Sequence, residues 1–289
     1  NEFFSLDMFS PDELLNNSSE YVFYYGYDIY GNKLSTVPTL KEFFEGVDDN
    51  GEKTRKIAPF QPIYTAGYIQ DKFAIEDLIF NVGLRIDRYD ANQKVLKDKY
   101  LLYPAYTVDT DLSASDVIST TNHPSNIGGD YVVYVDDVAN PSTIVGYRNG
   151  DDWYDSGGRK ISDPTLLSEA AGGSIAPYLG PTVASEAINN NISADAAFED
   201  YTPEIIFMPR IAFSFPISDE AQFFAHYDVL TQRPPGYNRL DPVGYLFLAN
   251  DVGATLNNPD LKPERTIDYE LGFAKTLSLK SALKISAFY

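Results

Sequence analysis

The stretch IFNVGLRIDRY (residues 79–89) alternates apolar and polar side chains. Phe80, Val82, Leu84 and Ile86 share one parity, and polar or small residues fill the positions between them. Successive side chains of a β-strand point to opposite faces, so this stretch predicts a strand with one apolar and one polar face. About ten residues is also the length that a tilted strand needs to cross a bilayer.

The same pattern recurs in pairs along the chain and predicts three β-hairpins. They lie at residues 63–90, 205–230 and 265–289, with turns at Glu76–Asp77, at Ser218–Asp219 and near Ser278. Long polar segments occupy residues 1–62, 91–204 and 231–264. Tight turns at one end and long loops at the other are typical of an outer-membrane barrel. The segment 91–204 is interpreted as a long extracellular loop or a small inserted domain. Short helices are expected near residues 10–15, 39–44 and 166–171, the first two after N-capping hydroxyls.

Composition agrees with a strand-rich chain. Of 289 residues, 44% are hydrophobic, and 22 Tyr and 18 Phe suit strands and aromatic girdles. The same richness suits a soluble, glycan-binding β-sandwich, so composition leaves both open. Mean hydropathy is −0.26, and no apolar run is long enough for a membrane helix. Mean hydropathy does not detect strands that alternate apolar and polar residues, because the contributions of the two faces cancel.

Charge and residue inventory exclude several functions. A formal charge of −20 speaks against nucleic-acid binding, which requires basic patches. Cysteine is absent, so thiolate metal sites and disulfides are impossible. His123 and His226 are the only imidazoles, and no nucleophile motif or phosphate loop is present. We therefore expect no enzymatic activity and no organic cofactor.

Acidic loops are the one place where the sequence offers a cation site. Asp109, Asp111 and Asp116 present carboxylates at short spacing, and a structural calcium ion is the candidate ligand. The spacing departs from an EF-hand, because Ala114 stands where glycine is required and Thr120 where the bidentate Glu belongs. A solvated acidic turn is the competing interpretation.

Parity divides the strand residues between two surroundings. The apolar set is predicted to face lipid: Phe80, Val82, Leu84, Ile86, Ile211, Phe213, Phe215, Ile267, Leu271 and Phe273. The opposite set is predicted to line a lumen and to meet substrate: Arg85, Asp87, Arg210, His226, Asp228, Asp268 and Glu270. Charges on that side avoid hydrocarbon and can border a wet pathway.

Two loop segments add candidate substrate contacts at the barrel mouth. Trp153 and Tyr154 lie in an acidic stretch, where aromatic faces beside carboxylates suit sugars or cations. Arg233, Tyr237 and Arg239 lie on a proline-stiffened segment, and paired guanidinium groups suit carboxylates or phosphates. Packing within the loops is the competing interpretation for both.

Several motifs resemble one family. YIQDKF (residues 68–73) and NVGLRID (81–87) resemble barrel strands of the TonB-dependent outer-membrane receptors. NPDLKPERT (258–266), running into YELGF (269–273), is similar to the N-P-x-L-K-P-E segment that precedes a late barrel strand in that family. YDANQK (89–94) is similar to the large receptors of the Bacteroidetes. The long loops show no resemblance.

The resemblance implies a 22-stranded antiparallel transmembrane barrel plugged by an N-terminal domain, of which this chain is a fragment that ends in mid-strand. It also implies an outer-membrane location with the long loops outside, and active import of a scarce nutrient such as a glycan, a peptide or a chelated metal. The implied partners are outer-membrane lipid and TonB, which is reached through the missing plug. A surface lipoprotein is a further candidate partner. No signal peptide is recognisable, so it is expected to have been removed or to lie outside the fragment.

Two other functions remain open from sequence alone. The barrel could hold a partner complex without transporting anything, which a TonB-binding segment upstream would distinguish. Alternatively, a soluble glycan-binding sandwich would bury the apolar faces against a second sheet.

Overall fold

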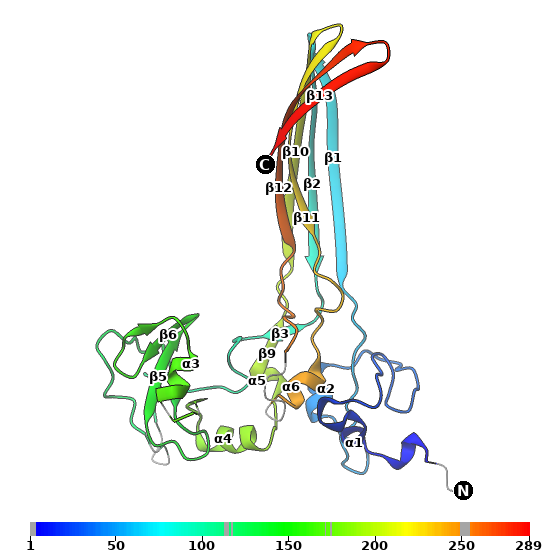
Figure 1. The fold of residues 1–289 in the computed structure, drawn as a ribbon. Helices are drawn as coiled ribbons and strands as arrows, with labels where there is room; N and C mark the ends of the chain where they lie inside the picture. Colours follow the sequence, from blue (N-terminus) through cyan, green and yellow to red (C-terminus); the bar gives the residue numbers. More distant parts are fainter. Residues whose placement is uncertain (1–3, 113–115, 117, 171, 174, 249–254) are drawn as a thin grey trace. The chain divides into compact units, whose positions relative to one another are not determined.

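The computed structural model describes residues 4–112, 116, 118–170, 172, 173, 175–248 and 255–289. The chain forms two compact units, each assembled from separate segments (Figure 1). Unit 1 comprises Asn1–Pro59, Leu96–Glu199 and Asp241–Leu256, and unit 2 comprises Phe60–Val95, Asp200–Leu240 and Asn257–Tyr289. The predicted hairpins lie in unit 2.

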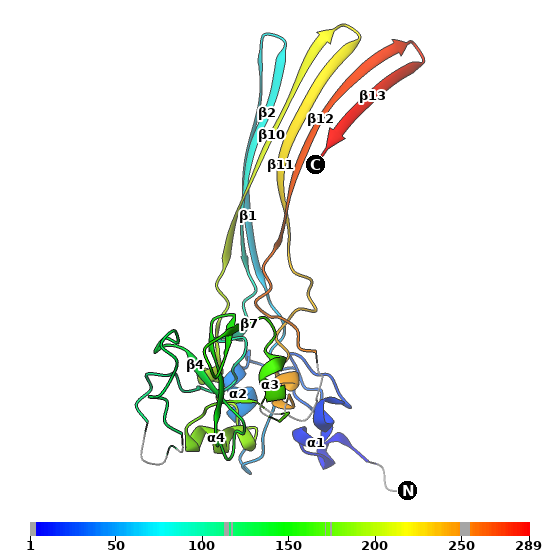
Figure 2. The same ribbon diagram turned by 60° about the vertical axis from the view of Figure 1, so that its left-hand side comes forward.

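Unit 2 contains a six-stranded antiparallel sheet in the order β1-β2-β10-β11-β12-β13. The strands are β1 (Ile63–Ile75), β2 (Leu78–Asp90), β10 (Glu204–Ser218), β11 (Ala221–Gln232), β12 (Glu264–Ser278) and β13 (Ser281–Phe288). Figure 2 shows the three hairpins side by side with their tight turns at one end. The predicted fold class is confirmed, and the sheet is open, with β1 and β13 as its edges.

Strand pairing places every predicted lipid-facing residue on one side of this sheet, here called the apolar face. Leu84 pairs with Ile69 and Pro209, and the neighbouring Val82 pairs with Ile211 and Asp71. The sequence of β1 leaves its own orientation ambiguous, because apolar and aromatic residues occupy both parities. Its pairing with β2 resolves the ambiguity, since Ile69 shares the side of Leu84.

Phenylalanine side chains form a row across the apolar face near the tight turns. Phe73 and Phe80 stack at 5.3 Å between ring centres, Phe80 and Phe213 lie 6.2 Å apart, and Phe213 and Phe223 lie 5.9 Å apart. Phe273 pairs with Phe223 on the next strand. A row of rings at one level is the arrangement of the aromatic girdles that flank the apolar band of membrane barrels.

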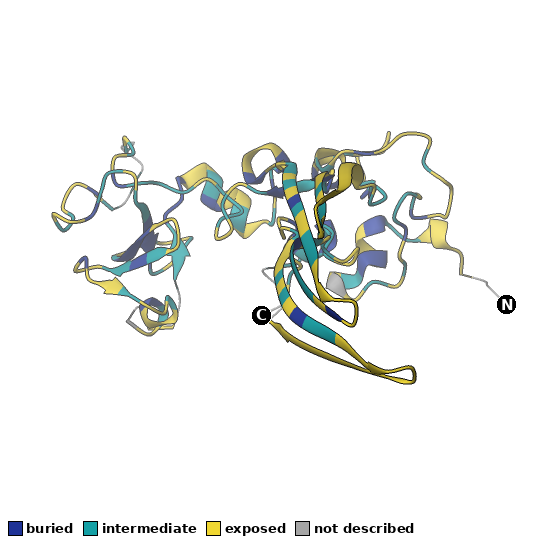
Figure 3. Cartoon of the chain, turned by 90° about the horizontal axis from the view of Figure 1, so that it is seen from above, coloured by how far each residue is buried: buried dark blue, intermediate teal, exposed yellow. Residues whose placement is uncertain are grey.

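The two faces of the sheet differ in exposure, and bands of burial alternate along the strands in Figure 3. On the apolar face Ile86 is 39% and Ile211 43% exposed. On the opposite side, here called the polar face, Asp87 is 4% and Asp228 6% exposed. Large aliphatic side chains are thus open to the surroundings while these two carboxylates are covered, the reverse of a soluble protein.

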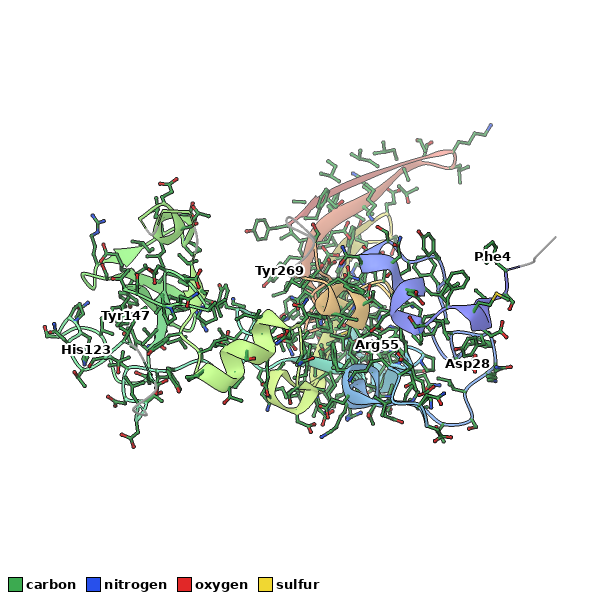
Figure 4. The ribbon with its side chains drawn as sticks, turned by 90° about the horizontal axis from the view of Figure 1, so that it is seen from below. Phe4, Asp28, Arg55, His123, Tyr147 and Tyr269 are labelled. Carbon is green, nitrogen blue, oxygen red and sulfur yellow. The ribbon has the colours of Figure 1, made fainter. Side chains whose placement is uncertain are left out.

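Unit 1 carries the helices. They are α1 (Pro11–Leu15), α2 (Leu40–Glu45), α3 (Thr165–Ala170), α4 (Pro181–Ile188), α5 (Ala194–Ala197) and α6 (Pro242–Leu246), with 3-10 turns η1 (Leu6–Met8) and η2 (Asn16–Ser18). Ser10 and Thr39 cap α1 and α2 through complete capping boxes, as their sequences predict. Arg55 (Figure 4) joins the two helices, with Nε 2.6 Å from Asp12 Oδ1 and Nη1 donating to the Phe43 carbonyl. None of the described helices is long and apolar enough to span a membrane.

A second antiparallel sheet lies within residues 132–177 of unit 1, with strand order β7-β6-β5-β4-β8. Its strands are β4 (Val132–Val135), β5 (Ile144–Asn149), β6 (Asp152–Asp155), β7 (Lys160–Ile161) and β8 (Ala176–Pro177). One core cluster contains Tyr147 (Figure 4) with Val133, and another contains Trp153 with Leu167. The long segment between the first two hairpins therefore has hydrophobic cores of its own. A two-stranded sheet of β3 (Lys94–Leu96) and β9 (Phe198–Asp200) lies where the chain passes between the units.

Candidate functional site

All seven strand residues predicted to line a lumen lie on the polar face of unit 2. Register explains this, because Arg210 pairs with Asp228 across β10 and β11, and His226 pairs with Glu270 across β11 and β12. Asp268 is opposite Asp228. The parity of the sequence thus brings these charges together, whereas their contact with substrate stays a prediction.

One cluster on the polar face joins β1, β2 and the segment after β11. The Tyr64 hydroxyl donates to the Asp87 carboxylate and accepts from Arg85 Nη2 at 2.8 Å. Arg85 Nε lies 2.8 Å from Asp87 Oδ1. The Arg233 guanidinium carbon stands 4.6 Å from the Tyr64 ring centre, a cation–π contact. Tyr64 was not predicted as a site residue, because alternating aromatic and aliphatic residues hid its orientation.

A second cluster occupies β10, β11 and β12. Arg210 donates two hydrogen bonds to Asp228, from Nε to Oδ1 at 2.8 Å and from Nη2 to Oδ2 at 3.1 Å. His226 lies between two carboxylates, with Nε2 3.2 Å from Asp268 Oδ2 and Nδ1 3.4 Å from Glu270 Oε2. Three carboxylates thus lie close together on β11 and β12, and each has a polar partner among the neighbouring side chains.

Glycine shapes the polar face beside the second cluster. A Cβ on Gly272 would lie 2.4 Å from the Phe224 ring, so the absence of a side chain lets that ring lie across β12. Lys284 Nζ stands 4.6 Å from the centre of the same ring and 3.6 Å from Glu270 Oε1. The Phe224 ring therefore borders the charged cluster on the side of the tight turns.

The NPDLKPE segment (residues 258–264) is held to the start of the sheet by two side chains. Lys262 Nζ lies 4.5 Å from the Tyr201 ring centre and 3.1 Å from Glu204 Oε1. Gln93 donates to the Pro259 carbonyl at 2.9 Å and accepts from the Leu240 amide at 2.8 Å. These contacts join residues far apart in sequence, so no local sequence pattern predicts them. They fix both ends of the loop that follows β11.

Tyr201 is buried beneath Lys262, and its hydroxyl has no hydrogen-bond partner. Burial raises the pKa of this phenol to about 12, although the Lys262 charge acts in the opposite direction. The hydroxyl therefore remains neutral at physiological pH, and Tyr201 acts as a packing residue under the segment.

The predicted loop contacts divide into two groups. Tyr237 is 72% exposed, Arg233 stacks on Tyr64, and Arg239 is half-buried with partners of its own. The expectation that Trp153 lies in a loop segment is wrong. Trp153 belongs to β6, is 7% exposed and packs in the core with Leu167.

Tyr154, its neighbour, is half-buried, with its ring 5.3 Å from that of Tyr131. Trp153 is buried because β6 pairs with β5. This pairing makes the acidic stretch a strand, and one side of that strand is buried.

The three carboxylates proposed for calcium do not come together as a ligand group. Asp116 accepts a hydrogen bond from the Tyr106 hydroxyl at 3.1 Å, and Asp109 and Asp111 are exposed. Within the described ranges, the one group of three or more clustered metal-ligating side chains is His226, Asp228 and Asp268. A calcium ion in the acidic loops stays a prediction, and the clustered group of ligating side chains lies on the polar face.

Comparison with models of known protein families identifies one family. The family model of the TonB dependent receptor-like β-barrel matches residues 3–289. Among solved structures, the hemophore receptor HasR of Serratia marcescens, determined as a double mutant with its hemophore HasA and heme, is similar at 14% identity and a TM-score of 0.36. That similarity covers 78% of this chain and 25% of the receptor chain. A search of curated protein sequences gave no match. The chain belongs to the TonB-dependent receptor-like β-barrel family, whose members are outer-membrane receptors and transporters.

Proposed function

We propose that this chain forms part of the wall of a TonB-dependent importer, with its polar face along the passage and its apolar face against lipid. The separation of residues between the two faces carries the proposal. The carboxylates of Asp87 and Asp228 are covered on one side, and exposed aliphatic residues occupy the other. In a membrane, hydrocarbon stabilises the exposed apolar set, and the charges remain in a wet interior.

The distribution of charge between the units supports the same arrangement. Unit 1 contains 28 acidic and 10 basic residues, a formal charge of −18. Unit 2 contains 14 acidic and 12 basic residues, a formal charge of −2. A wall embedded in lipid must avoid unpaired charge, whereas loops in water tolerate it. The charge of the chain is therefore carried by the part proposed to lie outside the bilayer.

The proposed orientation puts the tight turns in the periplasm and residues 91–203 and 231–263 outside the cell. Membrane barrels in general carry short periplasmic turns and long extracellular loops. The phenylalanine row near the turns would then mark the periplasmic interface. Proposed partners are outer-membrane lipid, TonB acting through a plug domain, and a surface lipoprotein. Proposed cargo is a scarce nutrient, namely a glycan, a peptide or a chelated metal.

Import is tested with the full-length receptor in its native outer membrane. Cells carrying the receptor should accumulate a nutrient that receptor-deleted cells do not, and loss of TonB should abolish that accumulation while the receptor stays in the membrane. Deletion of the receptor with no effect on uptake of any nutrient, but with loss of a surface partner complex, would favour the scaffold function instead.

Orientation is tested by cysteine labelling, because this chain contains no cysteine of its own. Ser156→Cys, in the exposed turn between β6 and β7, should react with a membrane-impermeant maleimide on intact cells. Asp219→Cys, in the turn between β10 and β11, should react only after the outer membrane is permeabilised. A background receptor freed of any other cysteines is the reference. Labelling in the reverse order would refute the orientation.

A further inference from the structure

The polar face brings together three side chains whose ligand atoms are close enough to contact one metal ion. His226, Asp228 and Asp268 each offer one ligand atom, and these atoms all lie within 4.8 Å of one another. The three residues come from neighbouring strands β11 and β12, whose backbone hydrogen bonds fix the spacing. An imidazole nitrogen with two carboxylate oxygens is a ligand set that divalent transition metals accept in proteins.

A residue outside this set, Glu270, orients the imidazole of His226. Glu270 Oε2 lies 3.4 Å from His226 Nδ1, and Glu270 is itself held by Lys284. When Nδ1 carries the proton and donates it to Glu270, the lone pair of Nε2 points toward Asp228 and Asp268. A carboxylate behind a ligating histidine is the usual means of fixing its tautomer in metal sites.

Asp228 is oriented in a similar way from the other side. Arg210 donates to both of its oxygens, at 2.8 and 3.1 Å, and holds the carboxylate plane. Each carboxylate oxygen has two lone pairs, so Asp228 Oδ2 can accept from Arg210 and still bind a cation. Asp228 is 6% exposed, which leaves few alternative positions for this group.

Charge in the cluster also favours a cation. Asp228, Asp268 and Glu270 supply three negative charges, while Arg210 and Lys284 supply two positive charges. With His226 neutral, one negative charge is left over in a partly covered site. A divalent ion is attracted by this net negative charge, and its binding would change the net charge of the cluster from −1 to +1.

We propose that His226, Asp228 and Asp268 bind a divalent transition metal ion, with Zn²⁺ as the representative. Glu270 and Arg210 act as positioning residues for the imidazole and for one carboxylate. Three protein ligands leave the remaining coordination positions to water or to donor atoms of another molecule. The site links β11 to β12 on the polar face, and it can exist whether or not the receptor imports anything.

The competing state of the same cluster is a protonated His226. Imidazolium carries N–H donors on both nitrogens and would satisfy Asp268 and Glu270 without a metal. The two states make opposite demands on Nε2, since a metal needs its lone pair and the ion pair needs its proton. Metal titration therefore distinguishes them.

The experiment uses the purified full-length receptor, stripped of metal with a chelator and titrated with Zn²⁺ at pH 7.5 by calorimetry. Wild type should show a saturable site that His226→Asn and Asp268→Asn lack. Glu270→Gln should keep the site and weaken it by about tenfold, the lower end for a positioning carboxylate. Co²⁺ should give a visible absorption band in wild type that His226→Asn removes, which reports nitrogen coordination directly.

Asp87→Asn is the matched control, because it removes a carboxylate from the polar face outside the cluster. It should leave the Zn²⁺ isotherm unchanged. Equal binding by wild type, His226→Asn and Asp268→Asn, or equal loss in Asp87→Asn, would overturn the proposal, as would a wild-type receptor that binds no Zn²⁺. Should His226→Asn fail to assemble, Asp268→Asn and Glu270→Gln decide the outcome by the same isotherms.

Discussion

Replacing Leu84 by arginine is expected to lower barrel stability by about 2–4 kcal/mol, the cost of a cationic side chain facing lipid at the bilayer midplane. Leu84 lies at the centre of β2 (Leu78–Asp90), on the apolar face, and is 37% exposed. Its register partners Ile69 and Pro209 offer no counter-ion. Reversible unfolding of the full-length receptor in lipid vesicles would measure the loss.

Asn81→Arg is the matched control for Leu84→Arg. Asn81 lies on the same strand at the opposite parity, between Lys72 and Ala212 in register. An arginine there would enter the polar face, and a change below about 1 kcal/mol is expected, in line with a surface substitution. Equal destabilisation by the two variants would mean that the two faces meet similar surroundings, and the assignment of the apolar face to lipid would fail.

The faces of β2, β10, β11 and β12 could be predicted because strand parity is a local property. One clear alternation fixes the orientation of every residue in the strand, so Arg210, His226 and Asp268 fall on one side without knowledge of the pairing. The strand β1 resisted the same reasoning. Its pairing puts Asp71 on the apolar face, next to Val82 and near the turn, where the alternation of the sequence is broken.

The parts of the site that escaped prediction depend on contacts between distant residues. The cation–π contact of Arg233 with Tyr64 and the hydrogen bonds of Gln93 with Leu240 join positions that share no local pattern. The metal-ligating group combines parity, which the sequence shows, with a diagonal proximity of His226 to Asp268, which only the register shows. The side of the sheet on which these residues lie is therefore predictable from strand parity, whereas their neighbours follow only from the pairing of the strands.

The sheet within residues 132–177 was missed for a different reason. Its strands have two to six residues, too short for an alternation to be recognised, and acidic turns separate them. The acidic stretch around Trp153 consequently predicts a loop. Its burial depends on pairing of β6 with β5 and on a cation in the core, Arg148, which hydrophobicity alone would place on the surface.

Replacing Arg148 by alanine is expected to destabilise this sheet by about 2–4 kcal/mol, through lost hydrogen bonds and an unfilled volume. Arg148 is 3% exposed. Its guanidinium donates to Asp98 Oδ2 at 2.6 Å and to the Tyr134 hydroxyl at 3.0 Å. Its Cζ atom also lies 4.8 Å from the Tyr100 ring centre and 5.7 Å from that of Trp153. Burial opposes the charge, but the hydrogen bonds of Asp98 and Tyr134 outweigh it and raise the pKa of Arg148.

The loss of stability in Arg148→Ala would be measured by protease cleavage of the full-length receptor at increasing urea concentrations. The cleavage to follow is that between residues 96 and 180. Arg159→Ala is the matched control, because Arg159 pairs with Asp155 at 3.1 Å but its side chain is 83% exposed. An exposed pair contributes about 0–1 kcal/mol, so cleavage in this variant should follow the wild type. Equal resistance of Arg148→Ala and Arg159→Ala would show that Tyr100, Tyr134 and Trp153 close the core without the cation. A selective loss in Arg148→Ala would show that this aromatic core, which includes Trp153, is assembled around a buried charge.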